Sequence, residues 1–376
     1  MRGVIHIMKF ICRQDQLTNG VSIVSKAVSS KSTLPILECI LIEAKNHQIK
    51  LTANDMELAI ETVIEGDILE EGKIAIEAKL FSEIIIKLPN SYLTVAVEDK
   101  YMTKITCEKA KFNIMGKPGD DFAYLPSIEK EKSIQISQFT LKELIRQTLF
   151  SISDNENNKL MTGELFEVKD NKLTVVSLDG HRISIRNSEL NGENDPVKVV
   201  VPGKTLSDIS KILSGEISDM VDIYFTDKHI LFEMDKTKVV SRLLEGEYYR
   251  INRMLSNDYE TKVVLNKKEF YNCIDRATLL IKESDKRPII LSVSDEMMDL
   301  QVSTSIGSMK EEMEIQKEGK DIMIGFNPKF LMDALRVIDD EEITIYMVNP
   351  KAPCFIKDEK ESYIYLILPV NFNRVS

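Results

Sequence analysis

The amino-acid sequence predicts an α+β fold in which three similar domains follow one another, each made of antiparallel sheets and two helices. Two repeated patterns indicate this fold class: a β-hairpin pattern occurs three times, and so does a strand that leads into a helix. A chain of 376 residues is longer than the usual domain with a single hydrophobic core. Its composition, with 43% hydrophobic and 29% charged residues, is typical of a globular protein. We therefore expect three cores along the chain.

Each domain is predicted to open with a helix and to continue with a hairpin. Apolar residues recur at helical spacing over residues 14–29, 140–151 and 267–281. Residues 41–52 then form two short apolar and β-branched runs around a polar turn, which is typical of a β-hairpin. This segment returns without gaps as residues 165–176, and a looser copy at residues 291–302 has one extra residue in its turn.

The second half of each domain is predicted to be a strand that ends at the start of a helix. Residues 74–84 have this pattern, and it recurs at residues 199–209 and 324–334 with Lys79, Lys204 and Lys329 at equivalent positions. The repeats place the domains at residues 8–127, 133–252 and 258–376. Linkers are expected near residues 126–132 and 252–258.

Composition and charge argue against a membrane protein, a metal centre and a general coat for nucleic acid. No apolar run approaches the roughly 20 residues of a membrane span, and the N-terminal residues lack a signal peptide's apolar core, so we expect a cytoplasmic protein. The five cysteines are scattered without a CxxC pair, so we expect no metal and no disulfide framework. With a net charge of −11, any contact with DNA has to be local.

Six segments of the chain resemble, in the same order, signatures of bacterial DNA sliding clamps, the beta subunits of DNA polymerase III. They are residues 8–10, 31–37, 178–183, 244–248, 325–331 and 367–370. The resemblance implies the DNA clamp fold: a head-to-tail homodimer whose six domains form a ring around duplex DNA, without sequence preference. Such a processivity factor tethers the replicative polymerase, the clamp loader and repair proteins through their short peptide motifs. The resemblance implies no catalysed reaction and no cofactor.

Two departures from the family pattern concern the region where clamps bind these partners. Tyr249 stands where the family has a proline, and Asn371 stands where an arginine usually follows the C-terminal Pro-Val. The alternative of a specialised, paralogous clamp with altered partners therefore stays open.

The resemblance also implies a shallow groove that receives the partner peptides, called here the partner-peptide site. Its two methionines and several aliphatic residues suit varied ligands, and its histidine and arginine offer directional polar contacts. The expected residues are Met161, Gly180, His181, Arg182, Ile183, Tyr249, Met254, Leu366, Leu368, Pro369 and Val370.

The Asp179-Gly180-His181-Arg182 segment within this set also permits two other interpretations. As a catalytic pair, Asp179 would orient His181 as a general base, which makes a hydrolase the alternative from another function class. As a purely structural feature, the segment would be a tight turn whose glycine permits an unusual backbone conformation. The sequence has no Gly-rich phosphate loop, nucleophile elbow or HExxH motif to accompany a catalytic pair.

Basic residues recur on the helices of all three repeats, at spacings of seven or eight in the second helix, which places each pair on one helix face. In a closed ring these helices would line the hole, where lysine and arginine attract phosphates independently of base sequence. The expected DNA-facing residues are Lys31, Lys79, Lys87, Lys142, Arg146, Lys204, Lys211, Lys329 and Arg336.

A ring of two chains needs unlike ends that fit each other. The resemblance implies that an edge strand around residues 112–114 of one subunit meets the third domain of the partner subunit. The expected dimer-interface residues are Ile114, Leu279 and Leu280.

Overall fold

The structure, a computed structural model, describes residues 8–29, 34–256, 258–282 and 287–372. Internal contacts divide the chain into two compact units. Unit 1 comprises Met1–Gln138 and Lys211–Leu243, and unit 2 comprises Phe139–Ser210 and Leu244–Ser376. Strands of the second repeat occur in both units, so the repeat boundaries and the unit boundaries differ.

Unit 1 contains two antiparallel sheets. The five-stranded sheet has the order β5 (Asp67–Glu70), β1 (Met8–Arg13), β7 (Tyr92–Val97), β8 (Met102–Cys107) and β9 (Ala110–Met115). The nine-stranded sheet has the order β10 (Lys117–Pro118), β6 (Gly72–Glu77), β2 (Cys39–Lys45), β3 (Gln48–Asn54), β4 (Leu58–Ile64), β18 (Thr237–Arg242), β17 (His229–Met234), β16 (Met220–Phe225) and β11 (Lys132–Ser137).

Unit 2 is also built on two antiparallel sheets. The nine-stranded sheet has the order β15 (Val197–Pro202), β12 (Gly163–Lys169), β13 (Lys172–Leu178), β14 (Arg182–Glu189), β27 (Tyr363–Ile367), β26 (Cys354–Lys357), β25 (Glu342–Met347), β19 (Thr261–Asn266) and β23 (Gln316–Gly319). The four-stranded sheet has the order β22 (Gly307–Glu314), β21 (Met297–Thr304), β20 (Ile289–Ser294) and β24 (Ile322–Phe326).

Both nine-stranded sheets join strands of two successive repeats. In unit 1, β4 of the first repeat pairs with β18 of the second, and Ile60 lies opposite Val239. In unit 2, β14 of the second repeat pairs with β27 of the third, and Ile185 lies opposite Ile364. Strand β9 lies at an edge of the five-stranded sheet, and β22 lies at an edge of the four-stranded sheet.

The three predicted hairpins are confirmed, with one correction. Leu41 lies opposite Thr52 and Leu165 opposite Val176, in the register that the repeat indicates. In the third hairpin Ser294 lies opposite Met297, so its turn also has two residues. The extra residue predicted in that turn is therefore wrong: the third hairpin has the same two-residue turn, which suits the twist of the strands.

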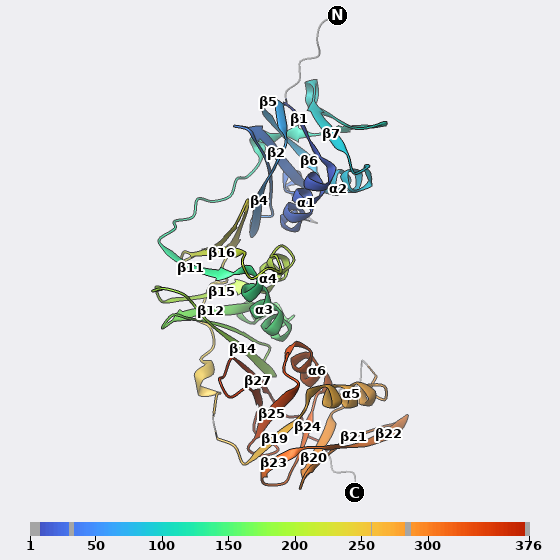
Figure 1. Ribbon diagram of the computed structural model, residues 1–376, viewed down its shortest axis with the longest axis vertical. Coiled ribbons are helices and arrows are strands. Elements are labelled where there is room, and N and C mark those ends of the chain that lie inside the picture. The colour runs from blue at the N-terminus through green and yellow to red at the C-terminus, as the bar shows by residue number, and fades with distance from the viewer. Residues whose placement is uncertain (1–7, 30–33, 257, 283–286, 373–376) are drawn as a thin grey trace, which may run out of the picture. The chain divides into compact units, whose positions relative to one another are not determined.

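The six predicted helices are confirmed, most with shorter ends (Figure 1). Helices α1 and α2 contact each other in unit 1, and α5 and α6 do so in unit 2. At the starts of α2 and α6 a side chain caps the first turn: Glu77 accepts from the backbone N–H of Lys79, and Asn327 accepts from that of Lys329. The helices are α1 (Gln14–Val24), α2 (Ala78–Lys87), α3 (Gln138–Thr148), α4 (Gly203–Ser210), α5 (Lys267–Thr278) and α6 (Pro328–Val337).

The shortness of α4 corrects one prediction. Lys211 was expected on the same helix face as Lys204, but α4 ends at Ser210 and Lys211 begins a turn. Directly after this turn Leu213 is buried, and the backbone N–H of Ser214 donates to the Gln138 side chain at 2.9 Å. These contacts end the helix early, so Lys211 is not on an α4 face.

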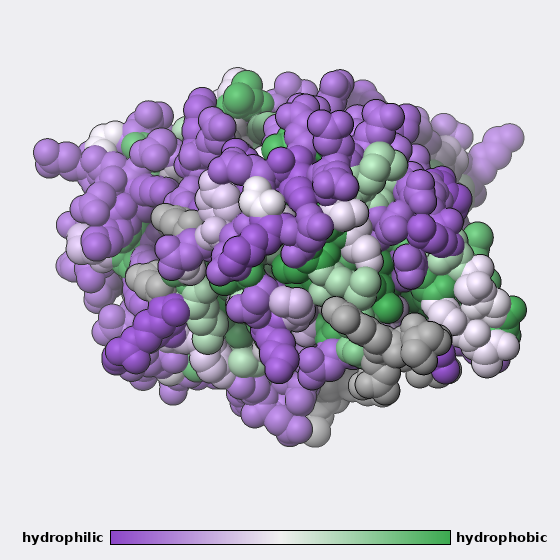
Figure 2. All heavy atoms as spheres, turned by 90° about the horizontal axis from the view of Figure 1, so that it is seen from below, coloured by the Kyte–Doolittle hydropathy of each residue, from purple (hydrophilic) through white to green (hydrophobic). Residues whose placement is uncertain are grey.

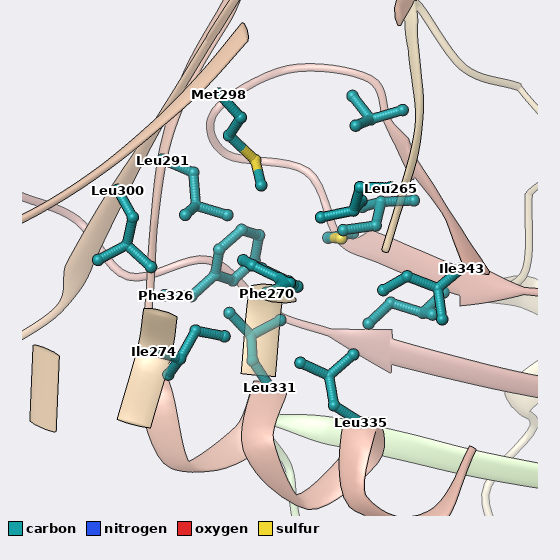
Figure 3. Packing of buried hydrophobic residues seen from close by; sticks show 14 of the residues in the cluster. Leu265, Phe270, Ile274, Leu291, Met298, Leu300, Phe326, Leu331, Leu335 and Ile343 are labelled. Carbon is teal, nitrogen blue, oxygen red and sulfur yellow. The ribbon is translucent and has the colours of Figure 1, made fainter. Parts of the chain in front are cut away.

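The core of the third repeat shows how helices and sheets pack in this fold. Phe270 and Ile274 of α5 meet Leu331 and Leu335 of α6, and strand residues such as Phe326 close the cluster (Figure 3). All five of these side chains are at most 1% exposed. Burying one leucine or phenylalanine contributes about 1.5–3 kcal/mol, so this cluster holds the two helices against the sheets.

Polar residues cover most of the face shown in Figure 2, and apolar residues are exposed between them in patches.

Within the described ranges, none of the helices combines the length and the apolar composition that crossing a bilayer requires.

Candidate functional site

The turn between β13 and β14 confirms the structural interpretation of the Asp179-Gly180-His181-Arg182 segment. One oxygen of Asp179, Oδ1, accepts hydrogen bonds from the backbone N–H groups of His181 at 2.9 Å and Arg182 at 3.1 Å. Gly180 has φ +88°, a left-handed conformation in which a side chain would be strained. The Asp179 carboxylate and this glycine therefore build the turn.

The alternative interpretation, in which Asp179 orients the imidazole of His181, does not fit these contacts. The second oxygen of Asp179 accepts a hydrogen bond from Arg182 Nε at 3.0 Å. The carboxylate therefore accepts hydrogen bonds from the turn backbone and from the guanidinium. The His181 ring is stacked on Phe330 of α6, with ring centroids 5.8 Å apart. This arrangement positions His181 by aromatic stacking and gives Asp179 a structural role.

Arg182 was expected as a polar contact in the groove, but its side chain is buried. Its residue exposure is 6%, and its Nη1 donates to Asp333 Oδ2 at 2.7 Å while Nη2 donates to the Phe150 carbonyl at 2.6 Å. The guanidinium also lies over the Phe330 ring, 4.6 Å from its centroid. Buried charges require such partners, so Arg182 holds the β13–β14 turn against α6 and does not offer its charge to a ligand.

The remaining residues of the partner-peptide site come from several segments of unit 2. Ile183 and Leu366 are buried in one apolar cluster, and Met161 and Tyr249 are partly buried against it. Met254 is 51% exposed and Leu368 is 37% exposed. Buried aliphatic residues beneath exposed methionine and leucine side chains form an adaptable apolar surface.

Backbone hydrogen bonds fix the C-terminal segment beside the turn. The N–H of Leu368 donates to the His181 carbonyl at 2.9 Å, and the N–H of Val370 donates to the Gly325 carbonyl at 2.8 Å. Pro369, between them, is half-buried. The structure thus brings the C-terminal residues of the site to the β13–β14 turn, although His181 and Leu368 lie 187 positions apart in the sequence.

Tyr249, which stands at the family's proline position, is fixed by two neighbours. Its hydroxyl accepts a hydrogen bond from the Asn158 side chain. Its ring meets the buried Tyr248 edge to face, with centroids 5.8 Å apart. The tyrosine therefore adds a hydroxyl and an aromatic face next to the apolar cluster.

The expected DNA-facing residues of α2 and α6 lie on exposed helix faces. Lys79 and Lys87 are exposed on α2, and Lys329 and Arg336 are exposed on α6. Lys204 is exposed on α4, and Lys142 is half-buried on α3. Lys31 lies outside the described residues.

Two acidic side chains, Glu143 and Asp339, engage Arg146. Its guanidinium donates to Glu143 at 2.6 Å and lies 3.3 Å from Asp339. The hydrogen bonds with Glu143 raise the pKa of Arg146 above its ordinary value. Part of its positive charge is therefore compensated within unit 2.

The sequence did not reveal Phe330 and Asp333, which hold His181 and Arg182. Their spacing of three on α6 places both on one helix face, but the sequence does not show what this face contacts. A cavity of about 650 Å³ between α5 and α6 also includes Lys267, Lys268 and Tyr271, which the recurrence of lysines did not indicate.

The expected dimer-interface residues have different environments. Ile114 is half-buried on the edge strand β9, and Leu279 is 80% exposed just after α5. Leu280 instead packs partly against the core of the third repeat. In the described part of the chain, no group of three or more His, Cys, Asp or Glu residues has a metal-site arrangement.

Comparison with known proteins gives one consistent result. Sequence models of the DNA polymerase III beta subunit match the N-terminal domain at residues 8–126, the central domain at 135–249 and the C-terminal domain at 252–371. The beta sliding clamp of Staphylococcus epidermidis is 35% identical over 375 residues, covering 97% of this chain and 99% of that protein.

Solved structures agree with the sequence comparisons. The Bacillus subtilis DNA polymerase sliding clamp is 35% identical, with a TM-score of 0.94 over 98% of this chain and 100% of that one. A crystallised chain from Eubacterium rectale is 62% identical, also with a TM-score of 0.94, over 97% of this chain and 100% of that one.

Proposed function

The chain belongs to the family of bacterial sliding clamps, the beta subunits of DNA polymerase III, and we propose that it encircles duplex DNA as a homodimeric ring. In this role it tethers the replicative polymerase, the clamp loader and repair proteins to DNA in the cytoplasm. It confers processivity and catalyses no reaction of its own.

The strand order of the sheets is the observation that carries the proposal. Among the residues that the structure describes, each unit has one nine-stranded sheet, unit 1 also has a sheet of five strands and unit 2 one of four. Strand β9 is equivalent to β18, because each is the third strand of a meander, after β7 and β8 or after β16 and β17. Strand β22 is likewise equivalent to β4, after β20 and β21 or after β2 and β3. Because β4 pairs with β18 inside the chain, β22 of one subunit is expected to pair with β9 of the partner subunit.

The same equivalence gives the register of this interface. In unit 1 Ile60 lies opposite Val239. The equivalent positions are Met309 on β22 and Phe112 on β9, so these two residues should lie opposite each other across the interface. Pairing at both ends of two chains closes a ring and covers two sheet edges that would otherwise favour uncontrolled association.

DNA contact is assigned to the exposed basic residues of the helices. Lysine and arginine side chains attract the phosphate backbone without base-specific contacts, which is what a sliding ring requires. With a net charge of −11, the rest of the chain carries an excess of acidic residues, which disfavours DNA contact there.

Peptide binding is assigned to the partner-peptide site of unit 2. Its apolar cluster with Ile183 and Leu366, and the exposed Met254 and Leu368, can bury the leucine and phenylalanine side chains of a partner. Titration with a short peptide containing Gln, Leu and Phe tests this assignment: Met254→Ala should weaken binding far more than Asn371→Arg.

The same titration distinguishes the two alternative functions. Tyr249 and Asn371 favour a specialised clamp, and no binding to the unchanged protein at concentrations that saturate an ordinary clamp would support it. A hydrolase would turn over substrates in nuclease or esterase assays, and this activity would disappear in His181→Ala. The ring itself is tested by the mass in solution, which should be twice 42.9 kDa.

A further inference from the structure

We propose that unit 1 carries a second peptide site, which binds an extended peptide with an apolar side chain followed by a carboxylate. The site is a cavity of about 380 Å³ beside the turn between β3 and β4. Its lining includes Met56, Glu57, Tyr124, Pro126 and Arg242. The inference rests on the proposed function of the partner-peptide site, because the two sites share a backbone frame.

The turn between β3 and β4 repeats the hydrogen bonds of the turn between β13 and β14. Asp55 Oδ1 accepts from the backbone N–H groups of Glu57 at 3.0 Å and Leu58 at 2.7 Å. The Asp179 carboxylate makes the same two bonds in unit 2. Glu57 in unit 1 therefore occupies the position that His181 has in unit 2.

The strand beside each turn is also held in the same way. The N–H of Arg242 donates to the Glu57 carbonyl at 2.9 Å, as the N–H of Leu368 donates to the His181 carbonyl at 2.9 Å. The last residues of the repeat complete each site, with Tyr124 in unit 1 and Tyr249 in unit 2. The frame is thus the same, but the side chains differ in charge.

The position between Asp55 and Glu57 carries a strained methionine. Met56 has φ +77°, where the equivalent Gly180 has φ +88°. A side chain in this region costs about 1 kcal/mol or more, and such residues concentrate at ligand sites. The Met56 side chain is 55% exposed and lines the cavity, so it offers an adaptable apolar contact.

Tyr124 and Pro126 add further apolar surface to the lining. Tyr124 is 49% exposed, and Lys73 Nζ lies 5.8 Å from the centroid of its ring. An aliphatic or aromatic side chain of a peptide can therefore pack against Met56 and Tyr124, whereas Lys73 is already paired with Asp120 at 2.7 Å.

Arg242 gives the site a preference for a negatively charged ligand. Its Nη1 lies 3.4 Å from Glu57 Oε1, and both side chains are more than half exposed, so this ion pair is weak. Burial, with the neighbouring charges of Arg242 and Lys228, lowers the pKa of His229, which also lines the cavity. With an uncharged histidine and an accessible guanidinium, the site can bind a carboxylate through two parallel hydrogen bonds.

The test uses the full-length protein with ¹³C-methyl-labelled methionine and the probe acetyl-Leu-Phe-Asp-Asp-amide. Met56 reports the second site, and Met56→Leu assigns its signal. The probe should shift the Met56 signal, and Arg242→Glu should weaken this response at least tenfold. Arg250→Glu is the matched control, because Arg250 is an exposed arginine paired with Glu247 at 3.3 Å in unit 2, and it should leave the response unchanged.

Two results would overturn the second site: no shift of the Met56 signal at millimolar probe, or an equal shift in Arg242→Glu. The peptide containing Gln, Leu and Phe is titrated in parallel, and Met254 reports its binding. If the Met254 signal shifts with that peptide and the Met56 signal does not shift with the acidic probe, the second site is excluded and the proposed function is supported. If Met254 does not respond to its own peptide, the proposed partner-peptide site fails, and a Met56 response lost in Arg242→Glu still supports the site in unit 1.

Discussion

Arg182 Nη1 donates to Asp333 Oδ2 at 2.7 Å, in an ion pair whose side chains are only 7% and 14% exposed. The pair joins the β13–β14 turn to α6. Without Asp333 the buried guanidinium keeps Asp179 but loses its second carboxylate, so Asp333→Ala should lower the free energy of unfolding by about 2 kcal/mol and weaken peptide binding. Chemical denaturation and peptide titration measure the two effects.

Asp339→Ala is the matched control for that substitution. Asp339 also pairs with an arginine, Arg146, but its side chain is 74% exposed, so its loss should cost less than about 1 kcal/mol. Equal destabilisation by the two substitutions would contradict a special role for the Arg182–Asp333 pair.

The dimer interface should depend on Leu279 more cleanly than on Leu280. Leu279 is 80% exposed, so Leu279→Asp should produce monomers with an unchanged free energy of unfolding. Leu280 packs against the core, so Leu280→Asp should also destabilise the fold. Light scattering and denaturation separate the two effects, and a dimeric mass for Leu279→Asp would place the interface elsewhere.

Retention on DNA should depend on the exposed basic residues of α2 and α6. Neutralising Lys79, Lys87, Lys329 and Arg336 should weaken binding and reduce the slope of log K against log salt by roughly 0.9 for each phosphate that the variant no longer neutralises. Arg146→Gln should change the slope less, because Glu143 and Asp339 already compensate its charge. An unchanged slope in the fourfold variant would exclude these helices as the DNA-facing surface.

Glu164 on β12 should make the stability of unit 2 depend on pH. Burial raises the pKa of its carboxyl group from 4.5 to about 8. Between these values the folded chain holds a proton that the unfolded chain releases, so stability falls as pH rises from about 4.5 to about 8 and is lowest above that range.

Glu164→Gln cannot ionise and should remove this decline. Its gain in stability over the unchanged protein should be largest above pH 8 and should fade toward pH 4.5, which denaturation at several pH values measures. A gain that does not change with pH would show that Glu164 does not titrate in this range.

Local patterns in the sequence were sufficient for the hairpins and for the strands that run into helices. The period of two in residues 41–52 and the helical spacing after Lys79 depend only on near neighbours. The pairing of β4 with β18 joins residues nearly 180 positions apart, and no local pattern indicates it. The sheets that continue across repeats therefore came only from the structure.

The partner-peptide site was also predictable from the sequence only in part. The resemblance indicated which residues gather, and the glycine in Asp179-Gly180-His181-Arg182 indicated the turn. The burial of Arg182 could not be predicted, because it depends on Asp333 and Phe330 of another element. Arginine is usually exposed unless it is paired, and the sequence does not show its partners.

Closure of the ring around DNA is the central claim, and a covalent trap tests it most directly. Phe112→Cys and Met309→Cys in one chain place two cysteines opposite each other at each proposed interface, at a separation that suits a disulfide. The five native cysteines are buried, so they should not compete. Oxidation with circular plasmid should give a clamp that stays with the DNA in denaturant and is released when the plasmid is cut once, whereas release from the uncut circle after complete cross-linking would contradict encirclement.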